Sequence, residues 1–413
     1  MSATPGVPVM SGSAAPGAVL SATRERIRPV DPASAARAAA RAADLAIPAG
    51  SLGRMLDLGV LLAAIQGTLQ PSFPRKAIVT AAGDHGVTRR GVSAFPAEVT
   101  PQMVANFVRG QAAVSALAGV AGARIMVVDA GVAADLRELL GDRVSADFST
   151  VFDNGGVLDR KVRLGTADLS RGAAMSREEA VRSLEAGIDV ALGLRGAGID
   201  LVGTGDMGIG NTTPSSALAC VFTGRTPADM TGRGTGIDDA SLERKRRVVE
   251  EGLSVNSPDP SDPVGVLAAV GGLEIGVIAG LILGGASVGI PIVVDGFIST
   301  AGALVACALA PHARGFLIAG HRSLEPGHRL MLDHLGLAPL LDLDLRLGEG
   351  TGAALAMPLI DGAAALLREM ATFAEAGVAG ANPGVTARRP VVAATRPMAA
   401  AGAVQAHQRV EAR

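Results

Sequence analysis

The chain has 413 residues, of which 48% are hydrophobic and 18% charged, and its formal net charge is −2 at pH 7. This length allows a large core and predicts one large domain with a smaller one, or two domains. The near-neutral charge argues against general binding to nucleic acid or to an anionic membrane. Only Cys220 and Cys307 occur, each in an apolar run, which argues against a disulfide framework and favours a reducing cytoplasm.

The two ends of the chain differ in composition from its middle. Residues 1–25 and 381–413 are rich in Ala and Pro, and we predict a flexible tail at each end. The first of these has no long apolar core, so we expect neither a signal peptide nor a membrane helix there. Residues 33–66 and 352–376 carry Ala/Leu-rich helical patterns, and they lie within the segments 26–75 and 350–380. These two segments predict a small helical domain, built from both ends of the chain, beside a large α/β domain of residues 76–349.

Short apolar runs alternate with helical patterns through the middle of the chain. The predicted strands are residues 77–82, 124–129, 200–203, 290–294 and 315–319. The patterns between them predict helices over 101–117, 176–194 and 241–252. Repeated strand–loop–helix units predict a parallel sheet covered by helices, with ligands at the carboxyl ends of the strands. That edge would then carry Asp84, Asp129, Asp206, Asp295 and His321.

Residues 275–294 form an uncharged run of the length of a membrane span. Glu274 and Asp295 flank the run, and no Lys or Arg lies near either end to orient insertion. Pro291 divides it into a helical part and a short β-branched part. We therefore predict a buried helix followed by a buried strand rather than a membrane span.

The segment GTGDMGIGNTTP, residues 203–214, combines several glycines with a polar helix start. Glycine allows backbone to approach a ligand closely, and free N–H groups at a helix N-terminus attract anions. The segment therefore predicts a phosphate cradle. It lacks the Gly-Lys-Ser/Thr of a Walker A motif, and its G-x-G-x-x-G spacing alone is weak evidence. A Gly-rich turn without a ligand is the alternative.

Two polar groups follow the first predicted strand. Asp84 and His85 are either a fragment of a metal site or a pair that stabilises the loop, and no cluster of Cys, His or Glu supports the metal. Ser93, Phe95 and Gln102 are candidates for the lining of an aromatic-binding pocket. A position in the core is the alternative for Phe95.

Two further motifs carry charge next to glycines. TGRGTGID, residues 231–238, precedes the basic run ERKRR, residues 243–247, most of which is expected on a solvated helix face, with Lys245 as the exception. Glu349 lies between Gly348 and Gly350. A carboxylate in a partly dry cleft is a candidate general base, because burial raises its pKa. A solvated Glu, or a charge at a helix N-terminus, is the alternative.

Taken together, these motifs resemble the nicotinate-nucleotide:5,6-dimethylbenzimidazole phosphoribosyltransferase family, over about residues 50–378. The resemblance lies in GSLG, AGDHGV with GVSAFPAEVTPQM, VVDAGV, GDMGIGNTT, TGRGTGID, VDGF, and HRSLEPGH with RLGEGTGAALA. It implies a Rossmann-like parallel α/β domain, a small helical domain and a homodimer. It also implies transfer of phosphoribose from nicotinate mononucleotide to dimethylbenzimidazole, with no cofactor and no metal.

The resemblance also implies roles for single residues. Glu349 would be the general base, and Lys245 and Asp206 would complete the catalytic group. The phosphate and nucleotide would be bound by Gly208, Ile209, Gly210, Asn211, Thr212, Gly234, Asp295 and Gly296. The acceptor base would be bound by Ser93, Phe95, Gln102 and Leu347.

One residue departs from the family pattern. The family usually has Glu where this chain has Asp206, so the carboxylate reaches roughly 1.5 Å less, about one carbon–carbon bond. Two other functions stay open at this point: transfer to another acceptor such as adenine or a phenol, and a silent nucleotide-binding homologue.

Overall fold

The computed structural model describes residues 17–380. Seven parallel strands form one sheet in the order β3-β4-β2-β1-β5-β6-β7. Their bounds are β1 Lys76–Gly83, β2 Ala123–Gly131, β3 Val144–Ser145, β4 Val157–Asp159, β5 Leu201–Met207, β6 Ile292–Val294 and β7 Leu317–Ala319. The predicted parallel α/β fold is confirmed. The short strands β3 and β4 were not predicted, because two or three residues show no alternation.

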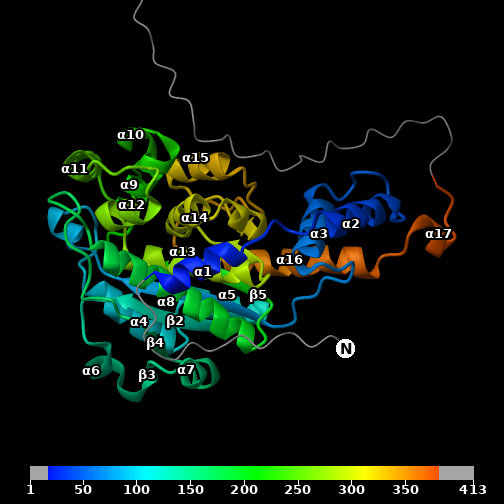
Figure 1. The fold of residues 1–413 in the computed structure, drawn as a ribbon, viewed down its shortest axis with the longest axis horizontal. Coiled ribbons are helices and arrows are strands. Elements are labelled where there is room, and N and C mark those ends of the chain that lie inside the picture. Colours follow the sequence, from blue (N-terminus) through cyan, green and yellow to red (C-terminus); the bar gives the residue numbers. More distant parts are fainter. Residues whose placement is uncertain (1–16, 381–413) are drawn as a thin grey trace, which may run out of the picture.

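Helices cover both faces of the sheet (Figure 1). Alternate residues of β1 enter two different cores, with Val79 in one and Ile78 in the other. The first core includes α1 Ala18–Arg26, α8 Arg177–Gly196, α9 Thr212–Thr223, α12 Pro263–Val270, α13 Leu273–Ser287 and α14 Phe297–Leu309. The second includes α3 Arg54–Gln66, α4 Val99–Val108, α5 Ala113–Ala121 and α16 Thr351–Glu369. This burial on both faces explains why the strands read as continuous apolar runs.

The remaining helices lie around these layers. They are α2 Pro32–Asp44, α6 Leu136–Leu140, α7 Phe148–Asn154, α10 Pro227–Met230, α11 Asp239–Asn256, α15 Pro326–Leu335 and α17 Phe373–Ala376. Three short 3₁₀ helices complete the set, at Gly86–Arg90, Gly141–Arg143 and Pro311–Phe316.

The run of residues 275–294 forms α13 followed by β6, as predicted. The glycines at 276, 280 and 284 face α8: a Cβ on Gly280 would lie 1.9 Å from the Leu184 carbonyl oxygen. The two helix backbones therefore pack in direct contact. Within residues 17–380, no helix has the length and apolarity of a membrane span.

The first predicted tail, residues 1–25, is wrong from residue 18 onward, because α1 occupies Ala18–Arg26. Glu185 of α8 accepts hydrogen bonds from the N–H groups of Gly17, Val19 and Leu20 through Oε1. A carboxylate distant in sequence thus caps this helix, which the local composition could not reveal. Residues 1–16 and the predicted tail 381–413 lie outside the described residues.

The predicted helix 101–117 is two helices, α4 and α5. Gly110, with φ of 72°, ends the first and lets the chain turn.

The helices α2, α3, α17 and the carboxyl-terminal half of α16 gather into one helical group at one end of the molecule (Figure 1). Ala38, Ala63 and Leu367 form its small core. The amino-terminal half of α16 packs on the sheet instead, where Ala353 and Met357 contact Gly203. The division at residue 350 stays a prediction.

Candidate active site

The carboxyl edge of the sheet collects the predicted polar side chains. Asp84 follows β1, and Asp129 and Asp206 lie within the last three residues of β2 and β5. Asp295 follows β6, and His321 lies two residues after β7. All five are buried. Because every strand is parallel, residues from five separate segments meet at this edge, which is the arrangement predicted for it.

The predicted phosphate cradle connects β5 to α9. The N–H of Ile209 donates to Thr100 Oγ1 at 3.1 Å, and the N–H groups of Asn211 and Thr213 donate to carbonyl oxygens of the same loop. Among the hydrogen bonds of the described residues, the N–H groups of Gly210 and Thr212 have no partner. Two backbone donors at the start of a twelve-residue helix are therefore available to an anion.

Asn211 lies at the N-cap of α9, but its side chain does not cap the helix. Its Nδ2 donates instead to Asp206 Oδ2 at 2.9 Å. The other oxygen of Asp206 is buried without a partner. Burial, followed by the neighbouring carboxylate of Asp295, raises the pKa of Asp206 well above its ordinary value. The shorter carboxylate at this position is thus tied to the phosphate loop.

Lys245 reaches the same loop from α11. Its side chain is fully buried, and Nζ donates to Thr212 Oγ1 at 2.7 Å and to the Gly232 carbonyl at 3.2 Å. Burial lowers its pKa to about 8, against the opposing effect of Glu325. Its neighbours Arg244 and Arg247 are exposed. Lys245 is therefore buried where Arg244 and Arg247 are exposed, and its role in the site stays a prediction.

Glu349 occupies a strained turn. Gly348, Glu349 and Gly350 all have positive φ, of 81°, 65° and 99°. Such a φ is unfavourable for Glu and persists only where the surroundings enforce it. Thr80 Oγ1 donates to the Glu349 carbonyl at 2.9 Å. The side chain is only 6% exposed, and its Oε2 has no partner. Burial raises its pKa, partly offset by the N–H of Val114 at the start of α5. Glu349 is therefore not the solvated residue of the alternative interpretation.

Asp295 stabilises this turn by hydrogen bonds to the backbone that follows Glu349. Its Oδ2 accepts the N–H of Gly350 at 3.1 Å, and its Oδ1 accepts those of Gly352 and Ala353 at 2.7 and 3.1 Å. Burial raises its pKa to about 7 in spite of these three bonds. The structure gives Asp295 a clear role toward the loop backbone, whereas its predicted contact with a nucleotide stays a prediction. Gly296 lies against the ring of His321.

The predicted acceptor residues lie on three segments. Phe95 and Leu347 are 52% and 56% exposed, so Phe95 is not a core residue. Ser93 Oγ lies 3.3 Å from Thr235 Oγ1 in the TGRGTG loop. Gln102 is exposed on α4. No contact among the described residues yet defines these side chains as one pocket, and their joint role stays a prediction.

Sequence reasoning overlooked several buried polar residues at this edge. Glu274, considered only as a flank of the apolar run, pairs with His85 at 2.9 Å. Glu325 accepts the N–H of Gly234 at 2.8 Å. The available signal was a charged residue directly before an apolar run, as for Glu274, or directly before Pro-Gly, as for Glu325. The partner of each lies far away in sequence.

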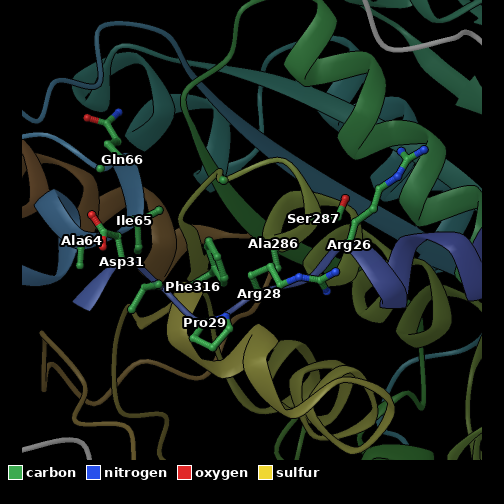
Figure 2. Close-up of a pocket in the computed structure, with 13 residues that line it drawn as sticks. Arg26, Arg28, Pro29, Asp31, Ala64, Ile65, Gln66, Ala286, Ser287 and Phe316 are labelled. Carbon is green, nitrogen blue, oxygen red and sulfur yellow. The ribbon is translucent and has the colours of Figure 1, made fainter. Parts of the chain in front are cut away.

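A hollow elsewhere on the molecule has no part in this arrangement. Figure 2 shows it among Arg26, Arg28, Ile65, Ala286 and Phe316. Gly289 and Phe316 on its wall precede β6 and β7, so it lies toward the amino ends of these strands. None of the predicted site residues lines it.

Known proteins resemble this chain over nearly all of the described residues. The sequence model of a family described as "Phosphoribosyltransferase" matches residues 27–378. Proteins named nicotinate-nucleotide–dimethylbenzimidazole phosphoribosyltransferase from Geobacter metallireducens and Geobacter sulfurreducens are 53% and 55% identical over 360 and 361 residues, covering 87% of this chain and 98% of each relative. A crystal structure of the Thermus thermophilus protein of that name matches with a TM-score of 0.78 and 47% identity, covering 85% of this chain and 100% of that one.

Proposed function

The chain belongs to the nicotinate-nucleotide–dimethylbenzimidazole phosphoribosyltransferase family, and from this premise we propose the reaction of its own active site. It is an enzyme of the phosphoribosyltransferase class. The proposed reaction moves the 5-phosphoribosyl group of nicotinate mononucleotide to 5,6-dimethylbenzimidazole. The products are α-ribazole 5′-phosphate and nicotinate.

The donor phosphate would bind at the start of α9. The free N–H groups of Gly210 and Thr212 point to this position, and Lys245 adds a positive charge beside Thr212 Oγ1. Backbone donors at a helix N-terminus, together with a cation, are the usual chemistry of phosphate recognition. Fixing the phosphate orients the sugar for in-line attack.

Glu349 would act as the general base. One ring nitrogen of the acceptor attacks C1′ as the bond from C1′ to the nicotinate nitrogen breaks. The attacking ring gains positive charge, which is relieved when the proton on its second nitrogen passes to the Glu349 carboxylate. Attack opposite to the leaving group inverts C1′ and gives the α-linkage. Assistance of this kind contributes about 10²–10⁴-fold.

The single observation that supports this proposal most is the setting of Glu349. Its carboxylate is buried with Oε2 unpartnered, on a turn whose Gly348 lies against Asp206. Asp206 in turn bonds to Asn211 of the phosphate loop. The base and the phosphate site are thus connected by two contacts, as a transfer between them requires.

Asp206 would respond to the charge of the donor. The nicotinate ring of the mononucleotide is cationic, and a nearby cation lowers the pKa of a carboxyl group. Entry of this ring would therefore favour the ionised form of Asp206, whose pKa is otherwise raised by burial. The ionised carboxylate would favour the bound cationic ring.

The acceptor would bind against exposed apolar side chains. Phe95 and Leu347 offer such surface to a flat aromatic ring, and Ser93 and Gln102 would add polar contacts. A homodimer and a cytoplasmic location are further proposals that rest on the family resemblance.

The test is incubation of the purified protein with nicotinate mononucleotide and dimethylbenzimidazole, followed by mass spectrometry. We expect α-ribazole phosphate and an equal amount of nicotinate. Product with adenine or a phenol alone would show a different acceptor. Binding of nicotinate mononucleotide without turnover on any acceptor would identify a silent homologue and overturn the proposal.

A further inference from the structure

Gly234, in the loop between α10 and α11, is held from three sides. Its N–H donates to Glu325 Oε1 at 2.8 Å, and its carbonyl accepts Nη1 of Arg346 at 3.0 Å. A Cβ at this position would lie 2.9 Å from Thr212 Oγ1 and 3.2 Å from Lys245 Nζ. We propose that Glu325 and Arg346 are positioning residues that clamp Gly234 and thereby align the phosphate site with the acceptor site. The inference rests on the proposed function and adds the residues that join its two halves.

Glu325 is placed for this contact rather than for its own helix. It is the N-cap residue of α15, yet its side chain makes no capping bond there. Its carboxylate lies against the loop: a Cβ on Gly232 would be 2.2 Å from Oε2 and 2.6 Å from Cδ of Pro326. The residue is only 6% exposed, and Oε2 has no partner. A buried carboxylate committed to one backbone N–H fixes that backbone strongly.

Lys245 connects the clamped loop to the proposed phosphate site of the phosphoribosyl donor. Lys245 Nζ donates to the carbonyl of Gly232, two residues before Gly234, and to Thr212 Oγ1. Gly232–Gly234 therefore lies between Glu325 on one side and the Lys245–Thr212 pair on the other. If the loop is released from Glu325, the ammonium group loses a fixed partner next to the phosphate site.

Thr235 connects the clamped loop to the loop that carries the predicted residues for the acceptor base. Thr235 Oγ1 accepts the N–H of Ala94 at 3.0 Å and lies 3.3 Å from Ser93 Oγ. Ser93 and Phe95 are two of the four predicted acceptor-binding residues. Arg346, on the other side of Gly234, immediately precedes Leu347 and the Glu349 turn. Gly234 thus lies against Thr212 of the phosphate loop and bonds to the segment of the general base, while its neighbour Thr235 bonds to the acceptor loop.

The experiment compares Glu325→Ala with Glu325→Gln, because the amide oxygen of Gln can still accept the N–H of Gly234. We measure kcat and the KM of each substrate separately. For Glu325→Ala we expect both KM values to rise about tenfold, as loss of one charge-assisted hydrogen bond allows. We expect kcat to change less than about threefold, since Asp295 and Thr80 hold the Glu349 turn independently. Glu325→Gln should restore both KM values to within about threefold of wild type.

Arg346→Ala is the second variant. Because Arg346 is exposed, its removal should not disturb folding, whereas removal of the buried Glu325 could do so. Arg346→Ala should raise both KM values in the same direction. The first control is Glu375→Ala, which removes a carboxylate that accepts the backbone N–H of Thr372 at the start of α17. The second is Arg177→Ala, which removes an exposed arginine paired with Asp262. Both controls should leave the two KM values unchanged.

Several results would overturn the clamp. Partial unfolding lowers kcat through the active fraction and leaves KM values alone, so that pattern in Glu325→Ala contradicts a positioning role. So does a rise in only one KM, or an Arg346→Ala variant with wild-type KM values. If the wild-type protein itself makes no product, the proposed function has failed. The clamp is then tested by calorimetric binding of nicotinate mononucleotide, which Glu325→Ala must weaken.

Discussion

Lys245 Nζ donates a hydrogen bond of 2.7 Å to Oγ1 of Thr212, the first residue of α9. The bond joins two helices that are separated by the whole TGRGTG loop. It places the ammonium group of Lys245 close to the N–H groups of Gly210 and Thr212, which are available to a phosphate. Burial of this ammonium group has a consequence that can be measured.

The affinity for the donor should fall in alkaline solution. Burial lowers the pKa of Lys245 to about 8, so the ammonium group is mostly charged at pH 7 and mostly neutral at pH 9. The phosphate, whose second pKa is about 6, stays dianionic over this interval. We expect kcat/KM for nicotinate mononucleotide to fall about tenfold from pH 7 to pH 9, because this ratio reports the free enzyme. Lys245→Met should show a low ratio without that fall. An unchanged alkaline limb in Lys245→Met would assign it to another group.

Replacing Glu349 by Gln should remove the base and keep binding. The amide has nearly the same shape but cannot accept the proton, so we expect kcat to fall by about 10²–10⁴. Calorimetry should show near-normal affinity for both substrates. Burial raises the pKa of Glu349, so the wild-type rate should also fall as acid protonates it, and this acid limb should vanish in the variant. Unchanged turnover would exclude Glu349 as the base.

Gly210→Val should raise the KM for nicotinate mononucleotide. Gly210 has φ of 87°, and a Cβ there would lie 2.7 Å from Cγ2 of Thr88, so the loop must shift and its N–H groups with it. Gly224→Val is the matched control, because Gly224 ends the same helix with φ of 67° and open space around it. The control should lower the melting temperature without changing KM. A normal KM in Gly210→Val would place the phosphate elsewhere.

The charge of Asp206 can be separated from its hydrogen bond. In Asp206→Asn the side-chain oxygen can still accept the bond from Asn211, while the negative charge is lost. Removal of one buried charge opposite a cationic ring should lower kcat/KM about ten- to a hundredfold. Asp206→Glu, which keeps the charge on a side chain one methylene longer, should keep activity within about tenfold. Full activity in Asp206→Asn would show that this charge is not used.

Asp295→Asn should loosen the Glu349 turn. At least one of the three N–H groups that Asp295 accepts would face an amide NH₂ group and lose its partner. A buried unsatisfied donor costs about 1–3 kcal/mol, so we expect a lower melting temperature and a lower kcat with KM values little changed. Asp31→Asn weakens the same kind of contact at the start of α2, far from the site. It should lower stability alone, and equal loss of kcat in both variants would contradict a specific role for Asp295.

Local patterns predicted the elements well where their causes are local. The strand near residues 77–82 and the helix–strand pair of 275–294 follow from apolar runs and from Pro291, and the structure contains them. The helix Ala18–Arg26 was missed because its cap is a carboxylate about 165 residues away, at Glu185. The break at Gly110 was missed because a glycine within an otherwise helical pattern does not by itself end a helix.

By itself, the sequence determined the parallel α/β class, the polar edge of the sheet and the identity of the motifs, because periodicity and residue type are written along the chain. Only the tertiary structure decided what each motif residue does. It placed Asn211 on Asp206 rather than on its own helix, Asp295 behind the Glu349 turn, and Glu325 on Gly234. The physical reason is that burial, hydrogen-bond partners and raised or lowered pKa values depend on groups that are distant in sequence and meet only where parallel strands end together.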